Sequence, residues 1–355
     1  MKLLKKIEIF LKNIIDKIAF EYRRPYNFTE ISDVFYFEKR AKILLLRHDK
    51  IGDLIVSTPF IRILRNRLPN AQIDILLSKS NISAKKCVEK YINKYWIYNK
   101  KKIDTLRLLR NLQNEKYDLV IDLFDNASTT SAFFIKYVNP TFALGIDKKN
   151  SRIYDYTVPM LDRFSSHIVE RIANLLLVFG IEPSEQNLDI EYPVDLKNNF
   201  LTSAKKKRFG INLAGSSDSR FWGIENNIKL IEFIQTNYIK SEVRVFATGK
   251  YLEVADKLKS IFPEIISDKC DNFDDFVYEV SKCDFIISPD TSIVHLASAF
   301  KIPSIIFYVR KIDMSHAPWY PFNSKFVSLE TQEDSISMIS FESVKEALKQ
   351  FETNF

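Results

Sequence analysis

A short apolar run, followed by a charged turn and a helix, constrains the fold of this chain more than any other feature. Residues 43–46 are consecutive isoleucine and leucine residues, the pattern of a strand buried on both faces of a parallel sheet. A second predicted strand at 73–77 follows after a helix-length interval, so the three segments predict a β–α–β unit. Ligands of such sheets bind just beyond the carboxyl ends of the strands. The polar residues and the glycine that follow the first strand are Arg47, His48, Asp49, Lys50, Gly52 and Asp53.

The rest of the chain repeats this alternation of strand and helix in two halves. The first half is predicted to hold strands at 43–47, 73–77, 118–123 and 142–145, with helices at 53–68, 103–115 and 165–180. The second half is predicted to hold strands at 209–214, 243–247, 284–288 and 304–308, with helices at 225–239, 251–261, 273–281, 292–300 and 341–351. We expect Pro59 to kink or restart the first helix, because its ring cannot donate the helical hydrogen bond.

Length and composition indicate a two-domain α/β protein. A chain of 355 residues can build two cores, and the polar segment 192–199 is predicted to link them. The predicted parts are an extension at 1–38, a first domain at 39–195, a second domain at 206–340 and a final helix at 341–355. The hydrophobic (46%) and charged (27%) fractions are typical of a soluble globular protein. No apolar run reaches the roughly 18 residues of a membrane span.

Several binding classes are excluded by missing patterns. Cys87, Cys270 and Cys283 are widely spaced and form no C-x-x-C pair, so we expect neither a disulfide nor a zinc site. The seven glycines form neither a dinucleotide fingerprint nor a P-loop. The net charge of +7 suggests anionic partners. No nucleic-acid-binding signature is present, and codon bias toward lysine is the alternative source of the charge.

Residues 2–20 have the pattern of a lysine-rich amphipathic helix. Acidic residues interrupt the apolar stretch and no small-residue cleavage site follows, so this is not a secretory signal. Two interpretations remain open. The helix lies in the plane of an anionic membrane, or it packs on the core of the protein itself.

The string R-x-D-x-I-G-D-x-I-x-x-T-P fills residues 47–59, and two further motif segments lie at 212–222 and 288–297. Together these three segments resemble the motifs of the lipopolysaccharide heptosyltransferases, family 9 of the glycosyltransferases, of the ADP-heptose transferase type. The resemblance spans roughly 41–340. It implies a GT-B fold, in which two Rossmann-like domains face each other across a cleft. The first domain would bind the acceptor and the second the nucleotide sugar.

In this resemblance Asp53 matches the proposed catalytic base. Glycosyl transfer needs a base for the acceptor hydroxyl and positive charge on the leaving diphosphate. Asp53 follows Gly52 at the head of a helix, so the alternative is a carboxylate that only stabilises the helix dipole. Asp49 is the second candidate base, with a solvated turn residue or a partner of Arg47 or Lys50 as its alternative.

Arg220 matches the position that contacts the donor phosphates, where the family often has lysine. A guanidinium stays charged and binds phosphate oxygens in bidentate fashion. Ser216, Ser217 and Ser219 lie in the same loop and could also meet phosphate. Trp222 is predicted to pack and fix this loop.

The segment Asp290-Thr291-Ser292 is predicted to start a helix, whose N-terminus suits a diphosphate. Thr291 or Ser292 could equally act only as the helix cap. Most of the family has glycine where Ser292 stands, and this departure leaves the donor open. His295 is expected to be a core residue behind the site. Thr248-Gly249 resembles the loop near the nucleotide, although Gly249 would also suit an ordinary turn.

Acceptor contacts are predicted at polar residues of the first half. The candidates are Arg47, Asp49, Lys50, Gly52, Arg62, Asp122, Asp125, Asn126, Ser128 and Thr129. The carboxylate and hydroxyl side chains among them could bind sugar hydroxyls. The cationic side chains could bind a phosphate or carboxylate of the acceptor. No Asp-x-Asp motif stands at a strand end, so a metal-independent reaction without a cofactor is expected.

The resemblance therefore implies an inverting glycosyltransferase that moves heptose from ADP-heptose onto a lipopolysaccharide or lipooligosaccharide core. The alternatives are the same reaction with a hexose or N-acetylhexosamine donor, and a membrane-peripheral protein that binds nucleotide sugar without turnover. The expected partners are the donor and a lipid-anchored glycan, with no nucleic acid. The expected location is the cytoplasm, on the inner face of the cytoplasmic membrane if residues 2–20 bind it.

Overall fold

The computed structural model describes residues 40–194, 206–213, 215, 217–267, 269–310 and 319–351. The predicted extension 1–38 and Ser216 lie outside these residues. The chain divides into two compact units between Leu188 and Asp189, just before the segment 192–199. Tyr192 of that segment is buried in the second unit, where its hydroxyl donates to Asp274 at 3.1 Å.

The first unit contains a parallel sheet with the strand order β3-β2-β1-β4-β5-β6. Its strands are β1 (Lys42–Leu46), β2 (Gln72–Ser78), β3 (Lys94–Tyr98), β4 (Leu119–Asp122), β5 (Phe142–Ile146) and β6 (Tyr156–Val158). This is the order of a dinucleotide-type Rossmann sheet, in which the direction of strand addition reverses between β1 and β4.

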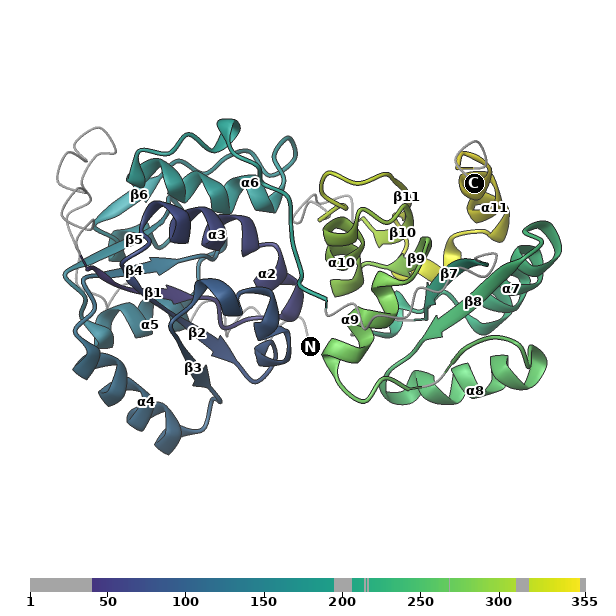
Figure 1. Cartoon of the computed structure of the whole chain (residues 1–355), viewed down its shortest axis with the longest axis horizontal. Helices are drawn as coiled ribbons and strands as arrows, with labels where there is room; N and C mark the ends of the chain where they lie inside the picture. The colour runs from purple at the N-terminus through teal and green to yellow at the C-terminus, as the bar shows by residue number, and fades with distance from the viewer. Residues whose placement is uncertain are drawn as a thin grey trace. The chain divides into compact units, whose positions relative to one another are not determined.

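Helices cover both faces of this sheet (Figure 1). They are α2 (Ile51–Ile55), α3 (Thr58–Arg67), α4 (Lys102–Glu115), α5 (Thr129–Val138) and α6 (Ile168–Ala173). Leu44 and Leu46 of β1 pack on the face covered by α4 and α5, while α3 and α6 lie on the other face. Pro59 is the second residue of α3, where its missing N–H is not needed. The predicted restart of the helix is confirmed.

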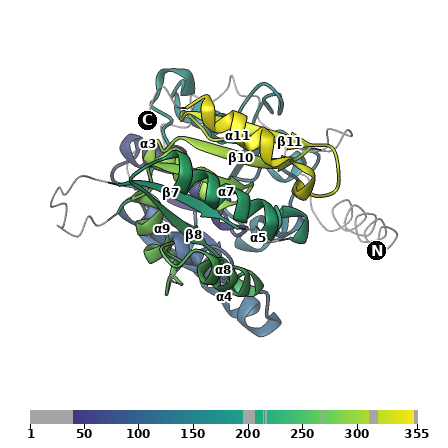
Figure 2. The same cartoon turned by 90° about the vertical axis from the view of Figure 1, so that its right-hand side faces the viewer.

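The second unit contains a parallel sheet with the strand order β11-β10-β9-β7-β8. Its strands are β7 (Lys207–Asn212), β8 (Ser241–Phe246), β9 (Phe285–Pro289), β10 (Ser304–Val309) and β11 (Phe326–Thr331). Its helices are α7 (Ile224–Asn237), α8 (Leu252–Ile261), α9 (Phe273–Ser281), α10 (Ser292–Phe300) and α11 (Phe341–Lys349), several of which Figure 2 shows in front of the sheet. Here the order reverses between β7 and β9.

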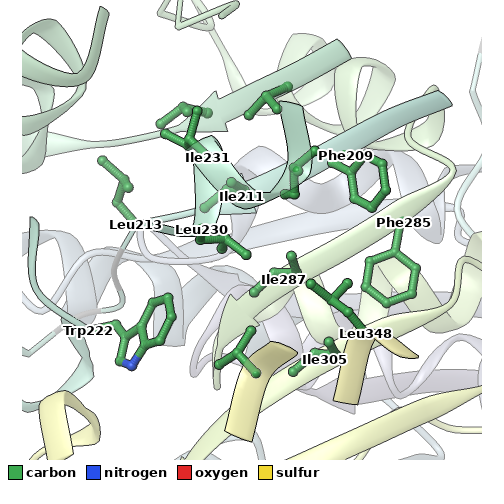
Figure 3. Packing of buried hydrophobic residues seen from close by; sticks show 14 of the residues in the cluster. Phe209, Ile211, Leu213, Trp222, Leu230, Ile231, Phe285, Ile287, Ile305 and Leu348 are labelled. Carbon is green, nitrogen blue, oxygen red and sulfur yellow. The ribbon is translucent and has the colours of Figure 1, made fainter. Parts of the chain in front are cut away.

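Alternate residues of these strands form the core of the second unit (Figure 3). Phe209, Ile287 and Ile305 point to the face covered by α7, α8 and α11. Trp222 is buried in the same cluster, and its indole N–H donates to the carbonyl of Ile339 at 2.8 Å. The prediction that Trp222 fixes its loop by packing is confirmed.

Candidate functional site

The first group of polar residues lies at the end of β1, where the strand order of the first unit reverses. Asp53 is the third residue of α2, and its carboxylate accepts a hydrogen bond from the backbone N–H of Lys50 at 3.2 Å. A carboxylate in the first helical turn stabilises the helix dipole. The Asp53 side chain is only 16% exposed, so α2 holds it in a defined position near the surface, and Lys50 beside it is exposed.

Arg47 lies beneath this turn and is 2% exposed. Its Nε donates to the backbone carbonyl of Asp53 at 2.8 Å, and Nη1 donates to the carbonyl of Leu123 at 2.8 Å. These bonds connect the start of α2 to the end of β4. Arg47 thus positions the turn, and its burial disfavours a direct contact with the acceptor.

Asp49 lies against the same guanidinium of Arg47. Its Oδ2 is 3.4 Å from Arg47 Nη1, and its backbone carbonyl accepts from the hydroxyl of Ser78 at 3.1 Å. Burial raises the pKa of Asp49 to about 8; Arg47 opposes this shift and Asp53 adds to it. The neighbouring Asn81, which is fully buried, donates to the carbonyl of Arg47 at 2.7 Å.

His48 points to the other side of the strand end. Its ring lies 4.9 Å from that of Phe124. Burial lowers the pKa of His48 to about 4; Asp122 opposes the shift, and Arg47 and Lys100 add to it. The imidazole is therefore neutral at pH 7 and part of an aromatic cluster.

Two carboxylates, one at the end of β4 and one in the loop after it, have protein partners. Asp122 is fully buried, and its Oδ2 lies 3.0 Å from Lys148 Nζ and accepts from the Tyr154 hydroxyl at 2.6 Å. Asp125 is 5% exposed, with its Oδ2 3.1 Å from Nη2 of Arg171. Both residues hold the loop in place and are poorly exposed for sugar hydroxyls.

Other predicted acceptor residues are on or near the surface. Asn126 is exposed, while Ser128 caps α5 by accepting from the N–H of Ser131. Gly52 is the second residue of α2, and Nη2 of Arg62 donates to the carbonyl of Asn187 at 2.6 Å. Contact of these residues with acceptor stays a prediction.

The second group of polar residues lies where the strand order of the second unit reverses. Arg220 Nη1 donates to the carbonyl of Asp290, and Nη2 donates to the Asp290 carboxylate at 2.8 Å. The side chains are 35% and 31% exposed. A Cβ atom at Gly215 would lie 2.8 Å from Arg220 Cδ and 3.0 Å from Thr291 Cγ2, so glycine leaves room for the arginine to reach Asp290.

Thr291 caps α10, since its hydroxyl accepts from the N–H of Ile293 at 3.4 Å. The side-chain amide of Asn212, at the end of β7, donates to Thr291 Oγ1 at 3.2 Å and to Ser288 Oγ at 3.0 Å. Asn212 and Ser288 were not predicted as site residues. The signal for both was a polar residue near the carboxyl end of a strand. Ser292 is the first residue of α10.

The remaining predicted donor residues surround this group. Ser217 is exposed and its hydroxyl lies 2.8 Å from that of Ser219. Thr248 and Gly249 are exposed, and the loop is joined to the Arg220 loop because Lys250 pairs with Asp218. His295 is buried in α10, with its ring 6.0 Å from that of Trp319. None of these placements tests phosphate binding.

Within the described residues, no group of three His, Cys, Asp or Glu side chains is arranged to hold a metal ion. No helix in the described part of the chain is long and apolar enough to cross a bilayer. Cys87, Cys270 and Cys283 are free thiols.

Two Rossmann-like units, each with polar residues where its strand order reverses, are the components of the GT-B fold, which the solved E. coli heptosyltransferase structures share. The family model described as glycosyltransferase family 9 (heptosyltransferase) matches residues 105–342. This is more than half of the chain, and the chain belongs to this family. It is therefore a glycosyltransferase.

Individual proteins agree with this assignment. An Escherichia coli (strain K12) protein, provisionally named lipopolysaccharide heptosyltransferase 4, is 24% identical over 97% of this chain and 96% of its own length. The lipopolysaccharide core heptosyltransferase OpsX of Haemophilus influenzae is 19% identical over 80% of this chain and 83% of its own. The structure of E. coli heptosyltransferase WaaC with ADP-2-deoxy-2-fluoro heptose is 16% identical with a TM-score of 0.71, and covers 87% of this chain and 99% of its own. The predicted fold and family are confirmed.

Proposed function

We propose that this protein is an inverting heptosyltransferase that moves heptose from ADP-heptose onto a sugar of a lipopolysaccharide or lipooligosaccharide core. Membership of family 9 supports the reaction class, and the names of the relatives support the substrate class. The observation that carries the proposal is the carboxylate of Asp53. It stands on the first turn of α2, after the central strand β1, held by the N–H of Lys50.

In this proposal Asp53 takes the proton of the acceptor hydroxyl. The hydroxyl oxygen attacks C1 of the heptose from the face opposite the diphosphate, the bond from C1 to the diphosphate breaks, and ADP leaves. A positioned general base contributes roughly 100- to 10,000-fold to such a step. The configuration at C1 is inverted because there is a single displacement.

Negative charge grows on the diphosphate as this bond breaks. We assign its stabilisation to Arg220 and to the N–H groups at the start of α10, which Thr291 caps and Asp290 flanks. Ser216, Ser217 and Ser292 would add hydroxyl donors. Thr248 and Gly249 would lie along the nucleotide, with His295 behind the site.

The acceptor is assigned to the first unit, where Lys50, Gly52 and Asn126 are the candidates near the surface. A lipid-anchored acceptor suits the inner face of the cytoplasmic membrane, and residues 2–20 are the proposed contact with anionic lipid. Ser292 stands where the family usually has glycine, at the position assigned to the donor. Hexose and N-acetylhexosamine donors therefore belong in the test.

The test is a thermal-shift series over ADP-heptose, ADP-glucose, UDP-glucose and UDP-N-acetylglucosamine, followed by transfer to a heptose-deficient core acceptor. A donor at 100 times its dissociation constant adds about 2.7 kcal/mol to the free energy of unfolding. ADP-heptose should give the largest shift, and NMR of the product should show inversion at C1. A larger shift with a UDP-sugar would show that the donor is that UDP-sugar and not ADP-heptose. A shift without any transfer would show that the protein binds nucleotide sugar without turning it over.

A further inference from the structure

The turn after β1 places two carboxyl groups against one guanidinium. Nη1 of Arg47 lies 3.4 Å from Asp49 Oδ2, and Nη2 lies 3.8 Å from Asp53 Oδ1. The side chains of Asp49 and Asp53 are also within hydrogen-bonding reach of each other. Two ionised carboxylates in such contact repel, and a single buried cation balances only one of them. With both acids ionised, Arg47, Asp49 and Asp53 together carry one negative charge, and one proton would neutralise it.

The hydrogen bonds assign different roles to the two acids. Asp53 Oδ2 accepts from the N–H of Lys50, so this carboxyl group acts as a hydrogen-bond acceptor. Asp49 Oδ1 is buried, and no donor among the described residues reaches it. A buried carboxylate oxygen without a donor is costly, whereas a protonated carboxyl group has a donor of its own to offer.

We propose that Asp49 is a positioning residue that stays protonated through neutral pH and donates its O–H to the carboxylate of Asp53. The catalytic part of this inference rests on the proposed transferase function; the protonation itself does not. The donated hydrogen bond fixes the rotamer of Asp53 and occupies one of its lone pairs. Asp53 alone is then the ionised base that faces the acceptor.

The surroundings of Asp49 agree with this assignment. The charged groups that act on its carboxyl group are Arg47 and Asp53, and burial is the largest cause of its raised pKa. From β2 and the loop after it, the neutral side chains of Ser78 and Asn81 bind backbone carbonyls. The other titratable groups nearby do not add a charge against Asp49. Lys85, on the 3₁₀ turn that packs on α2, lies over the ring of Tyr95. His48 is neutral, and Lys50 is exposed.

The proton balance of the proposed reaction closes with this pair. Before transfer the two acids share one proton, which resides on Asp49. Asp53 then takes a proton from the acceptor hydroxyl as the sugar bond forms. The pair then holds two protons, and one passes to water to restore the starting state. The Asp49 side chain is 21% exposed, so water reaches the edge of the pair.

The pH dependence of unfolding tests the protonation without any substrate. The folded chain would hold a proton on Asp49 up to pH about 8, whereas the unfolded chain loses it near the ordinary value of 3.8. The folded state then binds more protons between these values, and stability falls as the pH rises through that window. The unfolding equilibrium constant of the wild type should rise about tenfold per pH unit between pH 5 and 7, relative to Asp49→Asn.

Two variants complete the unfolding experiment. Asp147→Asn removes an exposed carboxylate of the same unit and should keep the wild-type slope. Asp53→Asn removes one of the causes that raise the pKa of Asp49, so the upper end of the pH-dependent window should move to lower pH. Parallel curves for the wild type and Asp49→Asn would overturn the proposal, because Asp49 would then be ionised in the folded chain.

Turnover provides the second test. An amide at position 49 still offers a donor to Asp53, so Asp49→Asn should lose less than about tenfold in kcat at pH 7 and should not show the decline above pH 8 expected of the wild type. Asp49→Ala should lose more, because no donor remains. Asp49→Asn as inactive as Asp53→Asn would overturn the positioning role. Absence of transfer by the wild type with every donor would instead remove the proposed function, and the unfolding slopes would still decide the proton.

Discussion

The two units place arginine in opposite environments at equivalent points of their sheets. In the first unit Arg47 is 2% exposed and lies among two carboxyl groups and backbone carbonyls. In the second unit the Arg220 side chain is 35% exposed and contacts one carboxylate beside the start of α10. In the first arrangement the cation is buried and the Asp53 carboxylate lies nearer the surface, whereas in the second the guanidinium and its carboxylate partner are about equally exposed. The proposed function assigns proton acceptance to the first arrangement and anion binding to the second, although both follow the same strand–loop–helix topology.

The largest expected effect is on turnover through Asp53. Asp53→Asn keeps the size of the side chain but removes the base, so kcat should fall roughly 100- to 10,000-fold. The N–H of Lys50 can still bond to the amide oxygen, which preserves the start of α2. Steady-state kinetics with saturating donor measure the effect. Retention of more than about a tenth of wild-type kcat would assign the base elsewhere, with Asp49 next to be examined.

The next largest effect is on stability in the first unit, through the buried pair of Lys148 and Asp122. Lys148→Met leaves a fully buried carboxylate without its cation and should lower the free energy of unfolding by about 3–5 kcal/mol. Chemical denaturation measures this loss. Adding Asp122→Asn should recover most of it, and a double variant as unstable as the single one would show that shape, not charge, is what the pair supplies.

Arg220→Ala should lower kcat/KM about 100-fold, since it removes charge from the leaving diphosphate. Both KM and kcat should change, because this charge grows as the bond breaks. Arg220→Lys is the matched control, because it keeps the charge without the bidentate geometry. Its kcat/KM should lie between those of the wild type and Arg220→Ala. An unaltered KM and kcat in the alanine variant would remove Arg220 from the site.

The smallest expected effect compares one helix cap in each unit. Thr291 caps α10 and Ser128 caps α5, so alanine at either position should cost about 1 kcal/mol in the free energy of unfolding. Only Thr291→Ala should also weaken donor binding, because only that helix is assigned to the diphosphate. Thermal denaturation with and without ADP separates the two effects. Equal loss of ADP stabilisation in both variants would contradict the assignment of α10.

The periodicity of the sequence predicted the central strands of both sheets and most of the helices. These strands are buried on both faces, so their apolar runs are continuous. It missed β3, β6 and β11 at the sheet edges and the helix α5. Edge strands are partly exposed and lose this pattern; β3 has no fully buried residue.

The site shows a similar limit. The motif letters indicated Asp53 and Arg220, but not that Arg47 is buried beneath the first turn or that Asp122 pairs with Lys148. The bond from Arg47 to Leu123 and the pair of Asp122 and Lys148 join residues far apart in the chain, and only the folded sheet brings them together. Residue type predicts which side chains can do chemistry, while burial decides which of them support the others.

The division of labour between the units is tested most directly by donor affinity. Calorimetric titration of ADP-heptose into the wild type, Asp53→Asn and Arg220→Ala separates binding from turnover. Asp53→Asn should bind the donor within about twofold of the wild type, because the base acts on the acceptor. Arg220→Ala should bind it at least about tenfold more weakly, because a charged contact to phosphate is lost. The reverse pattern, with affinity lost in Asp53→Asn and kept in Arg220→Ala, would contradict the account.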